Sequence, residues 1–185
     1  AIWKRVPRGH IQRIQRDEIN SLPDALTTES FTLLFGSIPG ESDTRRLTLQ
    51  CQSVQEPEET NETITNMLAG FQKRQSGTNT NQGTFTVTFL ETVDMAVLSR
   101  IRTWKQYARG TNTGSSIGYS EQYTRTANLT VFDTTGAAVK EVQIYKCFPS
   151  NIEAITYDSS NAAASVVVTV TFTYDYAIFG EAQTL

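Results

Sequence analysis

The residues of this 185-residue chain that could take part in catalysis or metal binding are few and far apart in the sequence. Its single histidine, His10, lies among arginines, and one histidine supplies neither a metal site nor a nucleophile–base pair. No serine stands in a G-x-S-x-G turn, and no glycine-rich phosphate-binding pattern occurs. Asp158 and Asp175 are candidates for a carboxylate pair, but acids beside turns are usually surface charges. The sequence therefore predicts a protein that is not an enzyme and binds no cofactor or metal.

The two cysteines, Cys51 and Cys147, have a spacing unlike that of any metal-binding motif. Both lie in strand-like segments, where a free cysteine is usually a small buried hydrophobe. The sequence therefore predicts two reduced core thiols and leaves a disulfide between them as the alternative.

Charge is distributed unevenly between the N-terminal segment and the rest of the chain. The net charge is −3, with 19% charged and 38% hydrophobic residues, which suits a soluble globular fold. Residues 1–20 are nevertheless basic, because Asp17 and Glu18 stand against five cations, Lys4, Arg5, Arg8, Arg13 and Arg16. The acidic remainder argues against a body that binds duplex DNA, since that needs clustered lysine and arginine. The basic arm predicts a contact with a partner.

Length and residue pattern predict an N-terminal arm, residues 1–28, and a single domain, residues 29–185. Within the arm, apolar residues at helical spacing favour a short helix over Ile11–Leu22. This helix is either part of a frayed terminus or a segment that a partner orders. No apolar run approaches the ~20 residues of a membrane span, and the N-terminus lacks the apolar core of a signal peptide. We therefore expect no membrane anchor, and folding in a cytoplasm.

Strand patterns dominate the first half of the domain. Residues 31–35, 45–53 and 84–91 each predict a strand. In the strand predicted at residues 45–53, one face carries Leu47, Leu49 and Cys51. In the strand predicted at residues 84–91, inward apolar residues alternate with outward threonines.

One strong helix signal follows at residues 92–110. Thr92 is the expected N-cap and Gly110 the expected stop. An apolar stripe that should pack on a sheet contains Val93, Val97, Ile101, Trp104 and Ala108. We interpret Trp104 as a packing anchor rather than as a platform for a ligand.

Residues 54–83 are rich in Thr, Asn, Gln and Glu and poor in core-forming residues. They predict either a flexible surface loop or a hairpin that turns at Ala69–Gly70 and has polar side chains on both faces. Because an isolated two-stranded hairpin is marginally stable, a hairpin here would have to be completed by another subunit.

The last third of the chain predicts a hairpin of residues 123–133 and 138–148, followed by strands over residues 151–158 and 165–179. At ~3.3 Å per residue the last strand would be nearly ~50 Å long. A strand of that length must bend across two sheets or pair with something outside the domain.

A structural corner, rather than a binding site, is predicted between these strands. Pro149 should end one strand and Asn151 should begin the next. Asp158 and Asn161 should form the turn that leads into the last strand.

The order of these motifs resembles that of the tail tube proteins of contractile bacteriophages. The resemblance is carried by "LTLQCQSVQEP", the polar hairpin, "TFTVTFLE", a helix with "IRTWKQYA", and the series "FPSNI", "YDSSN" and "VTFTYDY". It covers about residues 29–180, whereas the arm at residues 1–28 does not match the pattern.

The resemblance implies a mainly β fold, in which two packed antiparallel sheets form a β-sandwich or barrel with one flanking α-helix. Six subunits would form a ring whose strands close a large lumenal β-barrel. Stacked rings would form a tube that a contractile sheath drives through the host envelope and that conducts the genome. The implied partners are other copies, the sheath, the tape measure protein and genomic DNA, the baseplate and the tail terminator. The protein would belong to the virion after assembly in the bacterial cytoplasm.

Two alternatives remain beside the tube subunit. One is a baseplate ring of the same fold that initiates the tube. The other, of a different class, is a monomeric β-sandwich binding module.

The resemblance also implies where contacts lie. The hairpin at residues 59–76 and part of the last strand would face the lumen. The hairpin residues concerned are Glu59, Glu62, Thr63, Thr65, Gln72, Lys73 and Arg74. The five cations of the arm would contact the next ring or the sheath.

Overall fold

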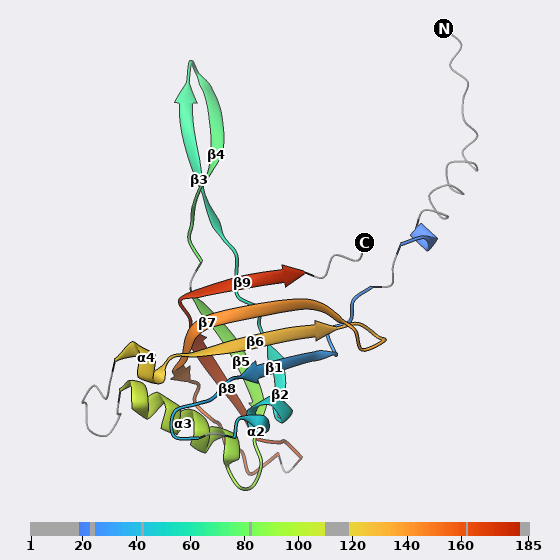
Figure 1. Cartoon of the computed structure of the whole chain (residues 1–185), viewed down its shortest axis with the longest axis vertical. Helices are drawn as coiled ribbons and strands as arrows, with labels where there is room; N and C mark the ends of the chain where they lie inside the picture. The colour runs from blue at the N-terminus through green and yellow to red at the C-terminus, as the bar shows by residue number, and fades with distance from the viewer. Residues whose placement is uncertain are drawn as a thin grey trace.

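A computed structural model describes residues 19–22, 25–41, 43–81, 83–109, 119–161 and 163–181 (Figure 1). The five cations of the arm and most of the helix predicted for Ile11–Leu22 lie outside the described residues. In the described part of the chain, no helix has both the length and the apolar character that a bilayer crossing requires.

Two antiparallel sheets share one long strand. The first sheet has the order β1-β6-β7-β9 and consists of β1 (Phe31–Phe35), β6 (Arg125–Phe132), β7 (Ala138–Ile152) and β9 (Tyr176–Glu181). The second sheet has the order β2-β5-β8-β7, in which β2 is Cys51–Val54, β5 is Thr84–Leu90 and β8 is Val167–Thr173. The chain is thus mainly β, as predicted.

The strand β7 passes from one sheet to the other. Its first half, from Ala138 to Cys147, pairs with β6, and residues 140–145 also pair with β9. Its last residues, from Phe148 to Ile152, pair with β8. Lys146 marks the corner, with a left-handed φ of 53°.

The core lies between the two sheets and is closed by the helix α3 (Ala96–Ala108). Phe172 of β8 stacks on Phe85 of β5, with ring centroids 5.2 Å apart. The ring centroid of Trp104 in α3 lies 5.6 Å from that of Phe35 and 5.7 Å from that of Phe172. The Trp104 Nε1 donates to the Tyr123 carbonyl oxygen at 2.6 Å. Trp104 therefore joins α3 to both sheets, and its predicted packing role is confirmed.

Two shorter helices, α2 (Arg45–Leu49) and α4 (Ser120–Tyr123), accompany α3. The prediction of a strand over residues 45–53 is wrong for its first half. Thr48 Oγ1 donates to the Leu33 carbonyl oxygen at 2.9 Å, and such tertiary contacts of the turn override the alternating pattern. In a helix, residues two apart point to different faces, so Leu47 is buried whereas Leu49 is 68% exposed.

The start of α3 also differs from its prediction. Residues 92–94 form a turn closed by the bond from the Met95 nitrogen to the Thr92 carbonyl oxygen, so Thr92 is not the N-cap. Met95 occupies that position with a left-handed φ of 53°. Val93 consequently leaves the predicted stripe and is fully exposed, whereas Val97 and Ile101 are buried.

Pro149 does not end a strand. It is buried within β7 and lies opposite Phe172, next to a register shift between Pro149 and Asn151. A proline is tolerated there because β7 is the edge of the second sheet and no further strand needs its missing N–H. Asn151 therefore continues β7, and residues 153–158 are not a strand, contrary to prediction.

The predicted long last strand bends across two sheets, which was one of its two predicted outcomes. It is divided into β8 and β9 by Tyr174 and Asp175. The alternation changes phase at this bend, so Tyr174 is buried but Tyr176 and Ile178 are about half exposed. The length of the segment is thus explained within one chain.

Candidate assembly interface

A two-stranded hairpin projects from the body of the protein (Figure 1). It consists of β3 (Asn61–Leu68) and β4 (Phe71–Asn79), and nearly all its side chains are exposed. Ala69 and Gly70 form the two-residue turn with φ values of 49° and 83°. Two left-handed residues match the right-handed twist of the flanking strands. The predicted hairpin and its turn are therefore present.

The strand register gives this hairpin two unlike faces, because residues directly opposite in an antiparallel pair share a face. The pair Leu68 and Phe71, next to the turn, sets the register. One face, here called the apolar face, carries Ile64, Asn66, Leu68, Phe71, Lys73 and Gln75. The other, the polar face, carries Thr63, Thr65, Met67, Gln72, Arg74 and Ser76. Both faces therefore carry polar side chains, as predicted, but Ile64, Leu68 and Phe71 gather on only one of them.

The apolar face is uncovered toward the tip. Ile64 packs over Gly77, where a Cβ atom would lie 3.0 Å from the Ile64 Cγ1. Leu68 and Phe71 have no such cover and are 58% and 79% exposed. Large apolar side chains gathered on one exposed face are typical of an interaction surface.

The seven residues predicted to face a lumen are not gathered on one surface. Thr63, Thr65, Gln72 and Arg74 share the polar face, whereas Lys73 lies on the apolar face. Glu62 sits at the register shift between Asn61 and Thr63. Glu59 precedes β3 and lies near Tyr174. Burial, and then the charges of Glu58 and Glu59, raise the pKa of the Tyr174 phenol.

Hydrogen bonds and an ion pair fix the root of the hairpin to the body. The Lys140 Nζ lies 2.6 Å from the Glu56 Oε1, and the Gln55 nitrogen donates to the Thr86 carbonyl oxygen at 2.8 Å. The direction in which the hairpin leaves the second sheet is therefore set by the body.

Threonines cover the outward face of the second sheet. The directly opposed residues of β5 and β8 include three threonine pairs, Thr84 with Thr173, Thr86 with Thr171 and Thr88 with Thr169. The residues between them, such as Val87 and Val170, point into the core. This half-buried face is polar but carries no charge on those six side chains. The alternating sequence of each strand predicts a face of threonines. That the threonines of β5 lie opposite those of β8 depends on the strand register, which the sequence does not give.

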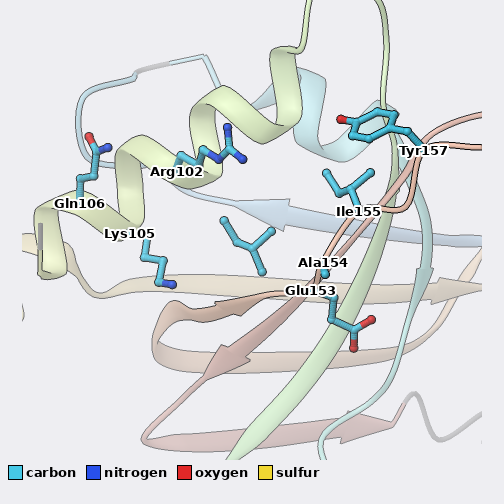
Figure 2. Close-up of a pocket in the computed structure, with 8 residues that line it drawn as sticks. Arg102, Lys105, Gln106, Glu153, Ala154, Ile155 and Tyr157 are labelled. Atoms are coloured by element: carbon cyan, nitrogen blue, oxygen red, sulfur yellow. The ribbon is translucent and has the colours of Figure 1, made fainter. Parts of the chain in front are cut away.

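An open groove of about 640 Å³ lies beside α3 (Figure 2). Arg102, Lys105 and Gln106 extend from the helix on one side of it. On the other side lies the segment after β7, with Glu153, Ala154, Ile155 and Tyr157. The described lining contains acidic and basic groups but no serine, cysteine or histidine, so it holds neither a Ser–His nor a Cys–His pair.

The residues of the predicted corner and the two aspartates have structural partners. Asp158 Oδ1 accepts from the Ser160 nitrogen at 2.9 Å and from the Ser160 Oγ at 2.6 Å, and these bonds lower the pKa of Asp158. The Asn161 nitrogen donates to the Asp158 carbonyl oxygen at 3.4 Å, which closes the predicted turn. Asp175 lies beyond the other end of β8 and pairs with Lys146 at 3.8 Å. The two carboxylates are thus engaged in separate turns.

Both cysteines are free thiols. Cys147 is fully buried and Cys51 partly so, and burial raises their pKa values to about 12 and about 11. Such thiols are poor nucleophiles and poor metal ligands at neutral pH. The residues that the structure describes include no group of three or more His, Cys, Asp or Glu side chains arranged to hold a metal ion.

Comparison with known proteins agrees with this arrangement. A family described as "Phage tail tube protein" matches residues 19–179. No curated protein sequence matches the chain.

Solved structures with a similar fold cover nearly the whole chain. A chain in the structure of the cap that terminates the tube of the anti-feeding prophage has 11% sequence identity and a TM-score of 0.62, over 88% of this chain and 95% of that one. A chain in the PVC sheath–tube complex of an extracellular contractile injection system has 12% identity and a TM-score of 0.60, over 89% of this chain and 97% of that one. A chain in the six-fold symmetrised anti-feeding prophage baseplate has 12% identity and a TM-score of 0.61, over 88% of this chain and 100% of that one.

Proposed function

Because this chain belongs to the phage tail tube protein family, we propose that six copies form a ring and that rings stack into a hollow tube. The observation that carries this proposal is the hairpin β3–β4, which projects from the body with uncovered apolar side chains at its tip. Such a hairpin is marginally stable by itself. A neighbouring copy would cover it.

The edges of the sheets support closure into a ring. In the described chain, β1 and β9 border the first sheet, and β2 and the end of β7 border the second. Open strand edges are sites of pairing with other chains, and closure of a sheet around a ring removes them. The second sheets of six copies would then form the lumenal barrel.

The threonine face of the second sheet suits the wall of that barrel. Its six paired threonines present hydroxyl groups without the positive charge that holds DNA. A genome would therefore pass along the wall without being held. The hairpin's polar face, with Thr63, Thr65, Gln72 and Arg74, would extend this wall, while Glu59, Glu62 and Lys73 would lie at its margins.

The role is mechanical rather than enzymatic. A contractile sheath would surround the tube and drive it through the host envelope, with the tape measure protein and genomic DNA inside. Head-to-tail stacking of rings gives an open filament, so the baseplate and the tail terminator would set its ends. Assembly would take place in the bacterial cytoplasm, and the product would be part of the virion. The basic residues of the arm would contact the next ring or the sheath.

A ring of limited polymerisation is the second candidate, because the folds of the cap and the baseplate are as similar to this chain as that of the sheath–tube complex. Electron microscopy of the purified protein at rising concentration separates the candidates. Long hollow filaments are expected. Single rings at every concentration would favour a tube initiator, and a monomer that never assembles, even on baseplates, would favour a monomeric binding module and overturn the proposal.

Removal of the hairpin tests its part in assembly. Replacement of residues 61–79 by a short Gly-Ser turn should leave a soluble protein with an intact body that forms no tubes. If this variant still forms tubes, the hairpin is not a required contact.

A further inference from the structure

Four apolar residues are exposed at the end of the body opposite to the hairpin. Leu49 ends α2, Val93 and Met95 belong to the turn before α3, and Val167 begins β8. Their exposed fractions are 68%, 104%, 38% and 40%. We call this group the end patch. Large apolar side chains that are exposed together at one end of a body are typical of a contact surface.

Hydrogen bonds and an ion pair join the three segments that carry the end patch. The Gln50 amide, next to Leu49, donates to the Leu90 carbonyl oxygen at 2.9 Å and to Thr92 Oγ1 at 3.2 Å. Arg46 of α2 pairs with Asp94, between Val93 and Met95, at 2.9 Å. Val167 lies opposite Leu90, and the Glu91 nitrogen donates to the Val166 carbonyl oxygen. These bonds hold α2, the turn and the start of β8 together.

The hairpin and the end patch stand at opposite ends of the same strand pair. Cys51 at the start of β2 lies opposite Phe89 near the end of β5, and Val54 at the end of β2 lies opposite Val87. The hairpin continues from Val54 and returns into Thr84, whereas the end patch follows Leu90. In Figure 1 the hairpin is at the top and the turn between β5 and α3 is at the bottom.

This arrangement provides two different surfaces that meet when copies stack head to tail. An interface that repeats without limit joins unlike surfaces at opposite ends of each subunit. Leu68 and Phe71 lie at the tip of the hairpin, and Leu49, Val93 and Met95 offer side chains of matching character at the other end. The charges agree as well. Lys73 forms no ion pair in the described chain, and the Asp94 side chain remains 57% exposed beside Arg46.

We propose that the apolar face of the hairpin, led by Leu68 and Phe71, docks on the end patch of a second copy of this chain in the next ring. This inference rests on the proposed tube and identifies its stacking contact. It also assigns the two faces of the hairpin different tasks, since the polar face with Thr65 and Arg74 stays free to face the lumen.

Charge substitutions on the two surfaces test the contact. Phe71→Glu and Val93→Glu should each leave single rings intact in size-exclusion chromatography and raise the protein concentration needed for tubes by ~10-fold or more. The matched controls are Gln72→Glu, beside Phe71 but on the polar face, and Tyr119→Glu, an exposed residue outside the end patch. Both controls should form tubes at the wild-type concentration. The double variant Phe71→Lys with Val93→Glu should regain tubes, because opposite charges then meet.

Cross-linking tests the contact without relying on loss of assembly. Tubes of a Phe71→Cys, Val93→Cys variant, treated with a short bismaleimide, should give a ladder of linked chains, whereas tubes with only the native cysteines should not. If wild-type tubes form but Phe71→Glu and Val93→Glu also form them, or no ladder appears, the docking contact is wrong and the tube stands. If the wild-type protein forms no stacked rings at all, the proposed function fails and the contact with it.

Discussion

The carboxylate oxygen Oε2 of Glu91 lies 2.7 Å from the backbone nitrogen of Leu98. Its other oxygen, Oε1, accepts from the Thr92 nitrogen at 2.9 Å and from the Val97 nitrogen at 3.3 Å. Glu91 thus directly follows β5 and at the same time satisfies the first free N–H groups of α3, which an N-cap residue usually does. The turn with Val93 is held at both its ends by this one side chain.

Loss of this side chain should destabilise the protein. Glu91→Ala is expected to lower the free energy of unfolding by about 1–2 kcal/mol, because it leaves buried N–H groups of α3 without acceptors. Glu91→Gln, which keeps one oxygen, should cost less. Urea denaturation followed by circular dichroism measures both, with Glu153→Ala on the surface as the control. Equal stabilities of Glu91→Ala and the control would show that α3 is capped in another way.

The Trp104 side chain should be the largest single contributor to the packing of α3. It is fully buried between Phe35 and Phe172, so Trp104→Ala is expected to lower the free energy of unfolding by about 3–5 kcal/mol. Trp104→Phe should cost less, since it keeps an aromatic ring but loses the bond to the Tyr123 carbonyl oxygen. Denaturation curves check this order, and it fails if Trp104→Ala costs under about 1 kcal/mol.

The two thiols should make the protein less stable at alkaline pH. Burial raises their pKa values from 9.0 to about 11 for Cys51 and about 12 for Cys147. Because the folded pKa values lie above the unfolded ones, the thiols contribute their full stability below pH 9 and lose it as the pH rises toward 11 and 12. The urea midpoint should therefore fall less steeply above pH 9 in Cys147→Ala than in the wild type. A thiol reagent at pH 8 should label Cys147 only after unfolding, and rapid labelling of the folded protein would contradict this.

Neighbouring residues of β5 should respond in opposite ways to the same substitution. Thr86→Lys places the ammonium group on the outward threonine face and should change the free energy of unfolding by no more than about 1 kcal/mol. Val87→Lys buries an unpaired charge in a site with no solvent exposure and should prevent stable folding. Comparison of soluble yield and circular dichroism tests which face is covered. Equal tolerance of both would mean that the two faces are wrongly assigned.

The sequence predicted those elements whose pattern is local. The alternation around Val87 and the spacing of Val97, Ile101 and Trp104 identified a half-buried strand and the main helix, because both depend on short-range periodicity. The position of the hairpin turn followed from Ala69–Gly70, which divides two polar segments, although a flexible loop was the alternative.

Elements that depend on tertiary contacts were not predictable in this way. The alternating pattern around Leu49 favours a strand, yet the bond of Thr48 to Leu33 in another strand holds a helix. Thr92 has the residue type of an N-cap, but the carboxylate of Glu91 takes that task from outside the helix. These two differences place Leu49 and Val93 at the surface. The end patch therefore exists where local pattern and tertiary structure disagree, which is also where functional sites are expected.

The amphipathic character of the hairpin depends on register in the same way. Composition alone indicates a polar segment, since Ile64, Leu68 and Phe71 are scattered among polar residues. Only the pairing of Leu68 with Phe71 places them on one face.

Helical reconstruction of filaments of the purified protein by electron cryomicroscopy tests the central claim most directly. We expect six copies per ring, with the second sheet closed around the lumen and Thr86 and Thr171 facing into it. A filament whose lumen is lined by α3 or by the first sheet, or a protein that forms no filament at any concentration, would contradict the account.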